Sequence, residues 1–480
     1  MSSVDYSPAR TLLRAAHQHP HRASLIDAQT GAVLSVSQSS DHVRRTTTVL
    51  AGLGIGEGSR VVLCTANSPW HFIVHVACSW LGAVSVVVSP RLPEGEIRHR
   101  INLAHGALVI VDSAQMASDL SLAHFKKMVD SAHPMMGEPP RRTTEVAAIL
   151  FTSGSTAQAR PIELTHEVLW WGTRNFRDGF EYSPGHHVVG VCAPMSHIGG
   201  FNGTSLDTFA HGGTVVVFES FNPELILRGV EQHRISMMFA VPTMCIALLE
   251  AQRTVEADLS SWVKPLVGGD ALTPLLREHM RQAGLDPIHV WGMTETSGAG
   301  AMMAPDAIGP AGAIGRPFPY VDLRICDEAG IQVEQGSIGE IQVRGPGVVT
   351  GSKWLRTADL GFIDEGGWIH LVGRASRMIN TGGELVAPAK IEEALRTLAG
   401  ITDAMVVGLE DERWGQIVAA AIVLAPGGGT GDLTSLQFLN AQLANVLAPW
   451  ERIRRMTTVD AIPLSVNGKP DPQAVIRLFA

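Results

Sequence analysis

The chain has 480 residues, more than one ordinary hydrophobic core accommodates, so we expect at least two domains. Its formal net charge is −9 and its basic residues form no stripe, which argues against a nucleic acid as partner. Five scattered cysteines show neither metal-ligand spacing nor a disulfide framework, and the N-terminus lacks an apolar signal core. These features predict a cytoplasmic location, whereas the oligomeric state is left open.

The first part of the chain alternates short apolar strands with helices. We expect strands at Val61–Ala66, Val84–Val88 and Leu108–Val111, and helices at Trp70–Gly82 and Glu94–Leu103. Residues 71–90 contain no Asp, Glu, Lys or Arg and nominally reach membrane length. Two histidines, the Leu81–Gly82 break and a valine run favour a buried helix followed by a buried strand, so we expect no membrane span.

A second alternating series follows. Its expected strands are Val188–Cys192, Val215–Phe218, Met237–Ala240 and Ile288–Trp291, with helices at Pro223–Gln232 and Thr243–Ala251 between them. Apolar strands that alternate with helices predict an α/β fold with two doubly wound parallel sheets, each covered on both faces. Residues 312–372 then become strand-rich with regularly spaced glycines, which predicts a β-barrel-like subdomain.

The pattern changes after Arg374. Helices are expected at Ala389–Leu398 and Leu433–Leu447, strands at Ala404–Leu409 and Val418–Leu424, and a flexible loop at 427–429. This composition predicts a small mobile α+β C-terminal domain. The expected division is a large N-terminal domain, residues 1–374, and a small domain, residues 375–480.

The most informative stretch is 357–384, TADLGFIDEGGWIHLVGRASRMINTGGE. Asp359 and Arg374 lie on a predicted β-hairpin at a separation that lets both side chains reach the two hydroxyls of a ribose. Gly382 and Gly383 let the backbone approach a bound chain closely. A glycine-rich hairpin with a surface arginine is the ordinary alternative for this stretch alone.

Four further motifs are spread along the chain, three of them before this stretch and one after it. Residues 149–156 read ILFTSGST, and their loop of backbone N–H groups and hydroxyls suits a polyphosphate. A second glycine turn, 268–272, follows a short apolar run, and 290–296 read VWGMTET. Near the end, 463–471 read PLSVNGKPD, where the Asn-Gly turn projects Lys469.

Together these motifs resemble the adenylate-forming superfamily, which comprises acyl-CoA synthetases, nonribosomal adenylation domains and luciferases. The resemblance is strongest to a stand-alone acyl-CoA synthetase, and it implies binding of ATP and Mg²⁺. The nucleotide-binding residues that it implies are Thr152, Ser153, Gly154, Ser155, Thr156, Gly268, Gly269, Asp270, Trp291, Gly292, Asp359 and Arg374. Trp291 would stack on adenine, and Thr294 would meet the α-phosphate.

The implied catalytic residues are Lys469, Thr294, Glu295 and His197. Glu295 would hold Mg²⁺ as a hard oxygen ligand. Lys469 would neutralise the charge that builds as the carboxylate attacks the α-phosphorus. His197 lies where the family often places a histidine or aromatic beside the substrate carboxylate, although a histidine among apolar residues is more often a packed core group.

Two departures from the family pattern affect moving parts. The phosphate loop continues Ala157-Gln158-Ala159-Arg160-Pro161 where the family has glycines and a lysine, and the hinge position carries Ser376. Rotation about Ser376 would exchange the face with Lys469 for the face with Gly382 and Gly383, which would line a thiol tunnel.

The acid pocket is expected from residues that carry no charge. They are His197, Phe201, Asn202, Trp262 and Met293. Asp207 and His211 are the nearest polar candidates. An amino-acid substrate would need an acidic partner for its ammonium, so a non-amino carboxylic acid, aryl or aliphatic, is preferred.

The expected function is an AMP-forming acid–thiol ligase that makes acyl-AMP and transfers the acyl group, most readily to coenzyme A. One alternative is a stand-alone adenylation enzyme that loads the phosphopantetheine of an acyl-carrier protein. Another is a luciferase-type oxidase that consumes O₂ and emits light. A non-enzymatic nucleotide-binding scaffold is the last, supported only by the altered phosphate loop.

Overall fold

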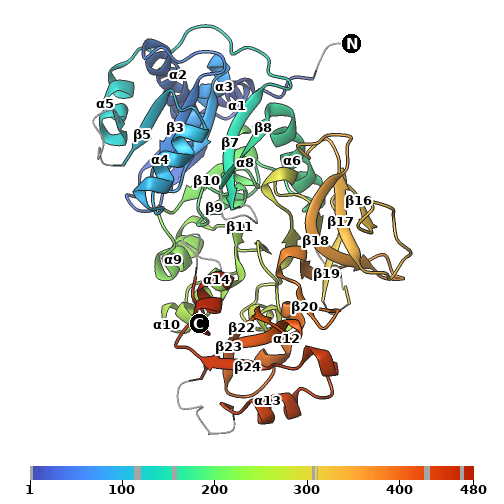
Figure 1. Ribbon diagram of the computed structural model, residues 1–480. Coiled ribbons are helices and arrows are strands. Elements are labelled where there is room, and N and C mark those ends of the chain that lie inside the picture. The colour runs from blue at the N-terminus through green and yellow to red at the C-terminus, as the bar shows by residue number, and fades with distance from the viewer. Residues whose placement is uncertain are drawn as a thin grey trace. The chain divides into compact units, whose positions relative to one another are not determined.

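The computed structural model describes residues 4–112, 120–153, 159–304, 307, 309–310, 312–425, 433–464 and 470–480. The chain separates into two compact units, Met1–Leu323 with Val343–Leu355 and Arg324–Gln342 with Arg356–Ala480 (Figure 1). The expected boundary between residues 374 and 375 falls inside the second unit. The division at that boundary stays a prediction.

The first unit contains a six-stranded sheet in the order β6-β5-β3-β4-β7-β8. Its strands are β3 (Arg60–Cys64), β4 (Val84–Val87), β5 (Leu108–Val111), β6 (Leu120–Ser121), β7 (Val146–Ser153) and β8 (Ala159–Thr165). All neighbours pair in parallel except β8, which returns antiparallel to β7. Parallel neighbours require crossovers, and helices supply them, as the alternating pattern predicted.

The helices of this region differ in burial. They are α1 (Pro8–Gln18), α2 (Val36–Gly52), α3 (Trp70–Leu81), α4 (Glu94–Leu103) and α5 (Leu122–Ser131). Helix α3 is buried along almost its whole length, whereas α4 buries only Arg100. The uncharged stretch 71–90 divides into α3 and β4 at Gly82, whose φ of +74° ends the helix. Among the described residues, no helix combines the length and apolarity needed to cross a bilayer.

A second, larger sheet of the first unit runs in the order β15-β14-β13-β12-β11-β9-β10-β1-β2. Its strands are β1 (Ala23–Asp27), β2 (Val33–Ser35), β9 (Val188–Val191), β10 (Thr214–Val217), β11 (Met237–Ala240), β12 (Lys264–Gly268), β13 (Ile288–Trp291), β14 (Ala301–Met302) and β15 (Ala313–Pro317). The six strands from β1 to β13 in this order are parallel. Their carboxyl ends therefore share one edge of the sheet.

Helices also follow the strands of the second sheet. They are α6 (His166–Gly179), α7 (Ile198–Phe201), α8 (Ser205–Ala210), α9 (Pro223–His233), α10 (Pro242–Val255) and α11 (Pro274–Gln282). A hydrophobic cluster packs residues of α9, α10 and α11 against this sheet. The two doubly wound sheets expected from the sequence are confirmed.

The expected β-barrel-like subdomain is an open sheet instead. Strands β16 (Asp322–Cys326), β17 (Gly339–Arg344), β18 (Leu355–Ile363) and β19 (Ile369–Arg374) follow one another in that order. In the described part of the chain β16 does not pair with β19, so the strands do not close. Regular glycines mark turns between strands, but closure also depends on strand tilt and register, which glycine spacing does not encode.

The remainder of the second unit is the expected small α+β fold. Its sheet runs β21-β20-β23-β22, with β24 beside β23. Its elements are β20 (Ile379–Thr381), β21 (Glu384–Val386), α12 (Pro388–Arg396), β22 (Ile401–Asp411), β23 (Gly415–Leu424), α13 (Leu436–Gln442), β24 (Arg455–Thr458) and α14 (Pro472–Arg477). The glycine loop expected at 427–429 lies outside the described residues.

The helix expected at Leu433–Leu447 is shorter than predicted. It begins after Ser435, whose hydroxyl accepts the N–H of Phe438. Within the helix, the side-chain amide of Asn440 accepts from the N–H of Ile453 at 3.0 Å and donates to its carbonyl at 2.8 Å. These hydrogen bonds tie the helix to the segment at Ile453, so the chain leaves the helix early. Apolar periodicity alone does not predict such a side chain–backbone contact.

Candidate active site

Three of the predicted site motifs of the first unit, those of His197, Gly268 and Trp291, lie at one edge of the larger sheet. Gly268 ends β12, Trp291 ends β13, and His197 follows β9. These strands belong to one run of parallel neighbours, β9-β11-β12-β13, so the three motifs leave the sheet from the same side. The carboxyl edge of an open parallel sheet is the usual ligand site of such folds.

Glycines at this edge permit close approach of backbone to backbone. A Cβ on Gly268 would lie 2.3 Å from the carbonyl oxygen of Val290, and one on Gly292 would lie 2.1 Å from that of Gly298. Gly269 has a φ of +83°, which an L side chain rarely adopts. The turns that carry the motifs therefore depend on glycine at these positions.

The Thr-Glu motif forms a short 3-10 turn, Thr294–Thr296. Thr294 is buried, at 8% exposure. The Thr296 hydroxyl accepts the N–H of Met293 and donates to the carbonyl of the same residue. The carbonyl of Glu295 accepts the N–H of Val349 at 2.9 Å, and its carboxylate forms no ion pair with a described residue. Hydrogen bonds thus hold the backbone of this turn, whereas the Glu295 carboxylate is not engaged in an ion pair with any described cation.

The carboxylate of Glu295 could ligate a magnesium ion that arrives bound to a nucleotide. Within the described ranges, no group of three or more His, Cys, Asp or Glu side chains could hold a metal without help. Mg²⁺ is usually held by one or two carboxylates together with substrate phosphates. Glu295 alone therefore fits the ion in the presence of ATP.

The expected acid-pocket residues do not all lie in one cluster. Phe201 is fully buried and packs edge-on against His75, with ring centroids 5.0 Å apart. Asn202 is also fully buried and donates to the hydroxyl of Ser297. Trp262 belongs to a different cluster, with residues of α9, α10 and α11. Its assignment to the acid pocket stays a prediction that this placement does not favour.

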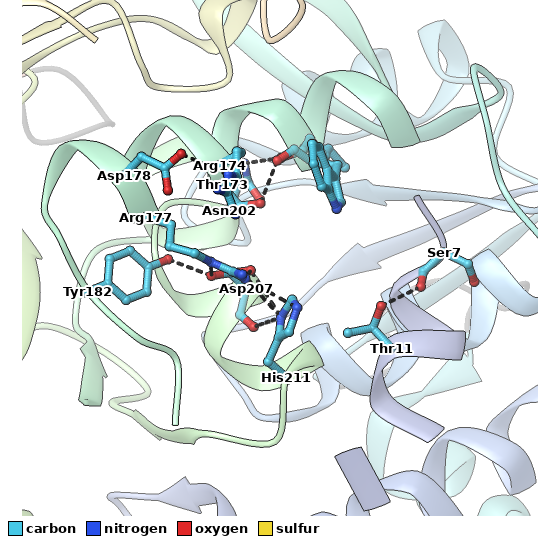
Figure 2. Close-up of polar contacts among 12 residues, drawn as sticks. Ser7, Thr11, Thr173, Arg174, Arg177, Asp178, Tyr182, Asn202, Asp207 and His211 are labelled. Atoms are coloured by element: carbon cyan, nitrogen blue, oxygen red, sulfur yellow. Dashed lines mark hydrogen bonds and ion pairs between the residues drawn. The ribbon is translucent and has the colours of Figure 1, made fainter. Parts of the chain in front are cut away.

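Asp207 belongs to a buried polar network (Figure 2). Its carboxylate pairs with Arg177 at 2.5 Å, accepts the Tyr182 hydroxyl at 2.8 Å and lies 3.2 Å from Nδ1 of His211. Burial raises the pKa of Asp207, but the hydrogen bonds and charges of His211 and Arg177 outweigh burial and leave this pKa lowered. The Asp207 carboxylate is thus engaged with Arg177, Tyr182 and His211 within the protein.

Phe239, at the end of β11, was not singled out by the sequence. A Cβ on Gly199 would lie 2.6 Å from its ring, and one on Gly268 would lie 3.2 Å from it. The ring is half-buried and spans between the segment after β9 and the end of β12. In the sequence, Phe239 is one of several apolar residues of a strand. Gly199 and Gly268 leave room for its ring, but they are distant in the chain, and nothing in the sequence connects them with Phe239.

In the second unit, Asp359 and Arg374 lie on the expected β-hairpin and pair with each other, whereas their contact with a ribose stays a prediction. They are register partners on β18 and β19, and Arg374 Nε lies 2.7 Å from Asp359 Oδ1. Asp359 is 3% exposed, and Arg374 also donates to the carbonyl of Thr357 at 3.0 Å. The pair presents a carboxylate held in one orientation by a half-exposed guanidinium.

The turn at Gly382 and Gly383 has positive φ at both residues, +64° and +88°. A Cβ on Gly382 would lie 2.7 Å from the ring of Trp414. The guanidinium groups of Arg454 and Arg413 lie over that ring, at 4.4 and 5.1 Å from its centroid. Trp414 and Arg413 were missed by the sequence reasoning, because their approach to the glycine turn comes from sheet pairing.

Ser376 lies in a 3-10 turn, Ala375–Arg377, between two ion pairs. Arg374 on one side binds Asp359, and Arg377 on the other binds Glu392 of α12 at 2.7 Å. The residues on both sides of Ser376 are therefore held by ion pairs, and only Ala375 and Ser376 lie between them.

Several predicted residues lie outside what the structure describes. They are Gly154, Ser155, Thr156 and Lys469, together with the side chain of Ser153. Thr152 is described and pairs with Arg160 near the end of the β7–β8 ladder.

Comparison with known proteins places these observations in a family. The pattern described as AMP-binding enzyme matches residues 12–352, and its C-terminal domain matches residues 390–469. Feruloyl-CoA synthase of an Amycolatopsis species is 29% identical and covers 97% of this chain and 98% of its own. Indoleacetate–CoA ligase of Aromatoleum aromaticum is 29% identical and covers 93% of both chains.

Solved structures show the same fold. ATP-bound MatB from Rhodopseudomonas palustris superposes with a TM-score of 0.90 at 23% identity, covering 99% of both chains. The o-succinylbenzoate-CoA synthetase MenE from Bacillus subtilis, bound to an acyl-adenylate, gives a TM-score of 0.86 at 22% identity and 97% coverage of both. The resemblance stated from the sequence is confirmed: the chain belongs to the AMP-binding enzyme family.

Proposed function

We propose that the chain is an AMP-forming ligase that joins an aromatic carboxylic acid to coenzyme A. The observation that carries the proposal is the meeting of the His197, Gly268 and Trp291 motifs at the carboxyl edge of one parallel sheet. Both relatives named above are, by name, a CoA synthase and a CoA ligase.

The reaction has two steps. A carboxylate oxygen of the acid attacks the α-phosphorus of ATP, the bond to the bridging oxygen breaks, and pyrophosphate leaves. The sulfur of coenzyme A then attacks the acyl carbon, its proton is lost, and AMP leaves with the electron pair of the acyl–oxygen bond. In the first step negative charge builds around the α-phosphorus, where positioned donors and cations lower the barrier most.

The residues divide these tasks between them. Thr294 would donate to the α-phosphate from its fixed turn, and Lys469 would neutralise the developing charge. Mg²⁺, held by Glu295, would supply charge neutralisation for the polyphosphate. Asp359 would accept hydrogen bonds from the ribose hydroxyls.

Two observations support an aromatic acid. Phe239 places a half-buried ring at the site edge, and an aromatic ring favours a planar aromatic partner by offset or edge contact. Asp207, the acidic candidate that the sequence offered nearest the pocket, is engaged with Arg177 and Tyr182 and is therefore a poor partner for the ammonium of an amino acid. A feruloyl group and an indoleacetate group, the acyl parts in the relatives' names, are both aromatic.

The surface beside the glycine turn supports coenzyme A as acceptor. Arg454 and Arg413 flank Trp414 next to Gly382, so cations and an aromatic face lie together at the predicted thiol path. Phosphates pair with guanidinium groups, and an adenine stacks on an aromatic face. A carrier protein would offer only the phosphopantetheine arm and lacks the nucleotide.

The test is acid-dependent release of pyrophosphate over a panel of aryl, aliphatic and amino acids, followed by coenzyme A-dependent thioester formation. Lys469→Ala should slow adenylation by about 10²-fold or more while still converting synthetic acyl-AMP to thioester. Light emission without coenzyme A would indicate the oxidase instead, and thioester formed only on a carrier protein would reassign the acceptor. If no acid in the panel releases pyrophosphate, the proposal is wrong.

A further inference from the structure

One hydrogen bond joins the segment that carries His197 to the turn that carries Glu295. The side-chain nitrogen of Asn202 donates to the hydroxyl of Ser297 at 2.9 Å, and both residues are fully buried. The same nitrogen lies 3.5 Å from the carbonyl oxygen of Leu169 on α6. Asn202 therefore bridges three segments that are distant in the sequence.

Ser297 needs outside support for its backbone conformation. It ends the 3-10 turn with a φ of +52°, and its N–H bonds the carbonyl of Thr294 at 3.0 Å. A residue other than glycine is disfavoured in this left-handed region and persists where its surroundings hold it. The hydrogen bond from Asn202 is a specific contact that holds it.

Helix α6 packs closely against the same turn. A Cβ on Gly172 would lie 2.3 Å from the Ser297 hydroxyl oxygen and 3.2 Å from the Asn202 nitrogen, so the helix approaches this closely only because residue 172 is glycine. Val349 donates to the carbonyl of Glu295 at 2.9 Å. Contacts from three separate segments thus fix the positions of Thr294 and Glu295.

Stability alone does not explain an amide at position 202. The side-chain oxygen of Asn202 is buried and accepts no hydrogen bond from any described residue. A buried unpaired acceptor destabilises the folded state, whereas an apolar side chain of similar shape avoids that penalty. An asparagine here therefore points to a requirement other than stability.

We propose that Asn202 is a positioning residue for adenylation: through Ser297 it holds Thr294 and Glu295 in register with the segment that carries His197. This proposal rests on the proposed function. It replaces the expected role of Asn202 as a wall of the acid pocket. The segment beside the acid and the turn beside the phosphate are then held by the same hydrogen bond. Loss of that bond would change the position of the acid relative to the α-phosphate.

The test compares Asn202→Leu, Ser297→Ala and the double variant in acid-dependent pyrophosphate exchange. Misplacing catalytic groups by an ångström can cost up to about 10²-fold, so we expect each single variant to lose at least about tenfold in kcat for adenylation. The double variant should lose no more than the worse single one, because both break the same link. Thioester formation from synthetic acyl-AMP should keep its wild-type rate.

Asn175→Leu is the matched control. Asn175 lies on α6, is fully buried and accepts the N–H of Tyr320 at 2.9 Å. Its side-chain nitrogen has no hydrogen-bond partner among the described residues, so it forms no hydrogen bond with Ser297. The control variant should melt at a lower temperature yet exchange pyrophosphate at the wild-type rate, whereas the Asn202→Leu and Ser297→Ala double variant should lose activity without a lower melting temperature.

Three results separate the possibilities. Wild-type exchange in Asn202→Leu, or strictly additive losses in the double variant, would overturn the positioning role while leaving the proposed function intact. A loss of exchange that follows the melting temperature across all variants, Asn175→Leu included, would make Asn202 merely structural. Absence of exchange in the wild-type protein with every acid would instead refute the proposed function.

Discussion

At the scale of single residues, the best-defined feature is the pairing of Asp359 with Arg374. The carboxylate is almost completely buried, which is costly for an isolated charge, and the guanidinium at 2.7 Å offsets that cost. Because Arg374 occupies one oxygen, the carboxylate has a defined orientation before a ribose arrives. Preorganised acceptors of this kind lose little entropy on binding.

Asp359→Asn should weaken ATP binding by roughly 1.5–3 kcal/mol, since the charge-assisted hydrogen bonds to the ribose become neutral ones. Isothermal titration calorimetry with ATP measures the change. Asp322→Asn is the control, because Asp322 is paired with Arg344 at 2.9 Å but is well exposed and carries no predicted ligand. An unchanged dissociation constant in Asp359→Asn would count against the ribose site.

Phe239→Leu should reduce the preference for aromatic acids. Loss of a ring–ring contact is worth about 0.5–1.5 kcal/mol, so kcat/KM for aryl acids should fall up to about tenfold relative to linear acids. Competition between an aryl and a linear acid in the thioester assay measures the ratio. Phe362→Leu, a half-buried phenylalanine stacked on His370 in the second unit, should leave the ratio unchanged. An unaltered ratio in Phe239→Leu would argue against an aryl contact.

At the scale of elements, the 3-10 turn Ala375–Arg377 is the candidate hinge. Ion pairs anchor the residues on both sides, Arg374 to the β18–β19 hairpin and Arg377 to α12. A change in the backbone dihedrals of Ala375 and Ser376 would then turn the elements after the hinge as a body. The position of Ser376 as hinge remains a prediction.

Ser376→Pro fixes φ near −65° and removes a donor, so it should restrict that rotation. If the fixed geometry suits adenylation, the variant should form acyl-AMP normally and release little thioester, whereas Ser376→Ala should behave as the wild type. Single-turnover yields of acyl-AMP and thioester, with a melting curve for folding, provide the measurement. Equal slowing of both steps in a well-folded variant would place the hinge elsewhere.

At the scale of the whole molecule, the first unit buries several histidines in neutral form. Burial lowers the pKa of His71 and of His289 to about 4 each. Burial, with the charge of a neighbouring group, lowers the pKa of His75 and of His166 to about 3 each. In the unfolded chain each histidine binds its proton near pH 6.5, so acid favours the unfolded state.

The sign of the resulting pH dependence is definite. Each folded pKa lies below the unfolded value, so the stabilisation is fully present above pH 6.5 and is lost as the pH falls, down to about 4 for His71 and His289 and to about 3 for His75 and His166. The slope is about 1.4 kcal/mol per pH unit for each histidine. His71→Gln should reduce the slope of unfolding free energy between pH 6 and 5 by that amount, as measured by urea unfolding. An identical slope in the variant would show that His71 does not titrate on unfolding.

The sequence by itself determined the alternation of strands and helices and the identity of the motifs. Both are local: apolar periodicity fixes which segments form elements, and a glycine turn or a Thr-Glu pair is readable where it stands. The uncharged stretch 71–90 was assigned correctly because Gly82 interrupts it. The placement of Asp359 and Arg374 on one hairpin was also readable from the sequence, because a hairpin is a local feature, whereas their ion pair was seen only in the structure.

Only the tertiary structure decided which distant residues meet. The strands after Arg324 form an open sheet because closure depends on register among strands, which no segment encodes alone. Asp207 joined Arg177 and Tyr182, Phe239 met Gly199 and Gly268, and Asn202 met Ser297 by contacts between segments far apart in the chain. A side chain's role depends on the neighbours that folding brings to it, and the sequence alone does not name those neighbours.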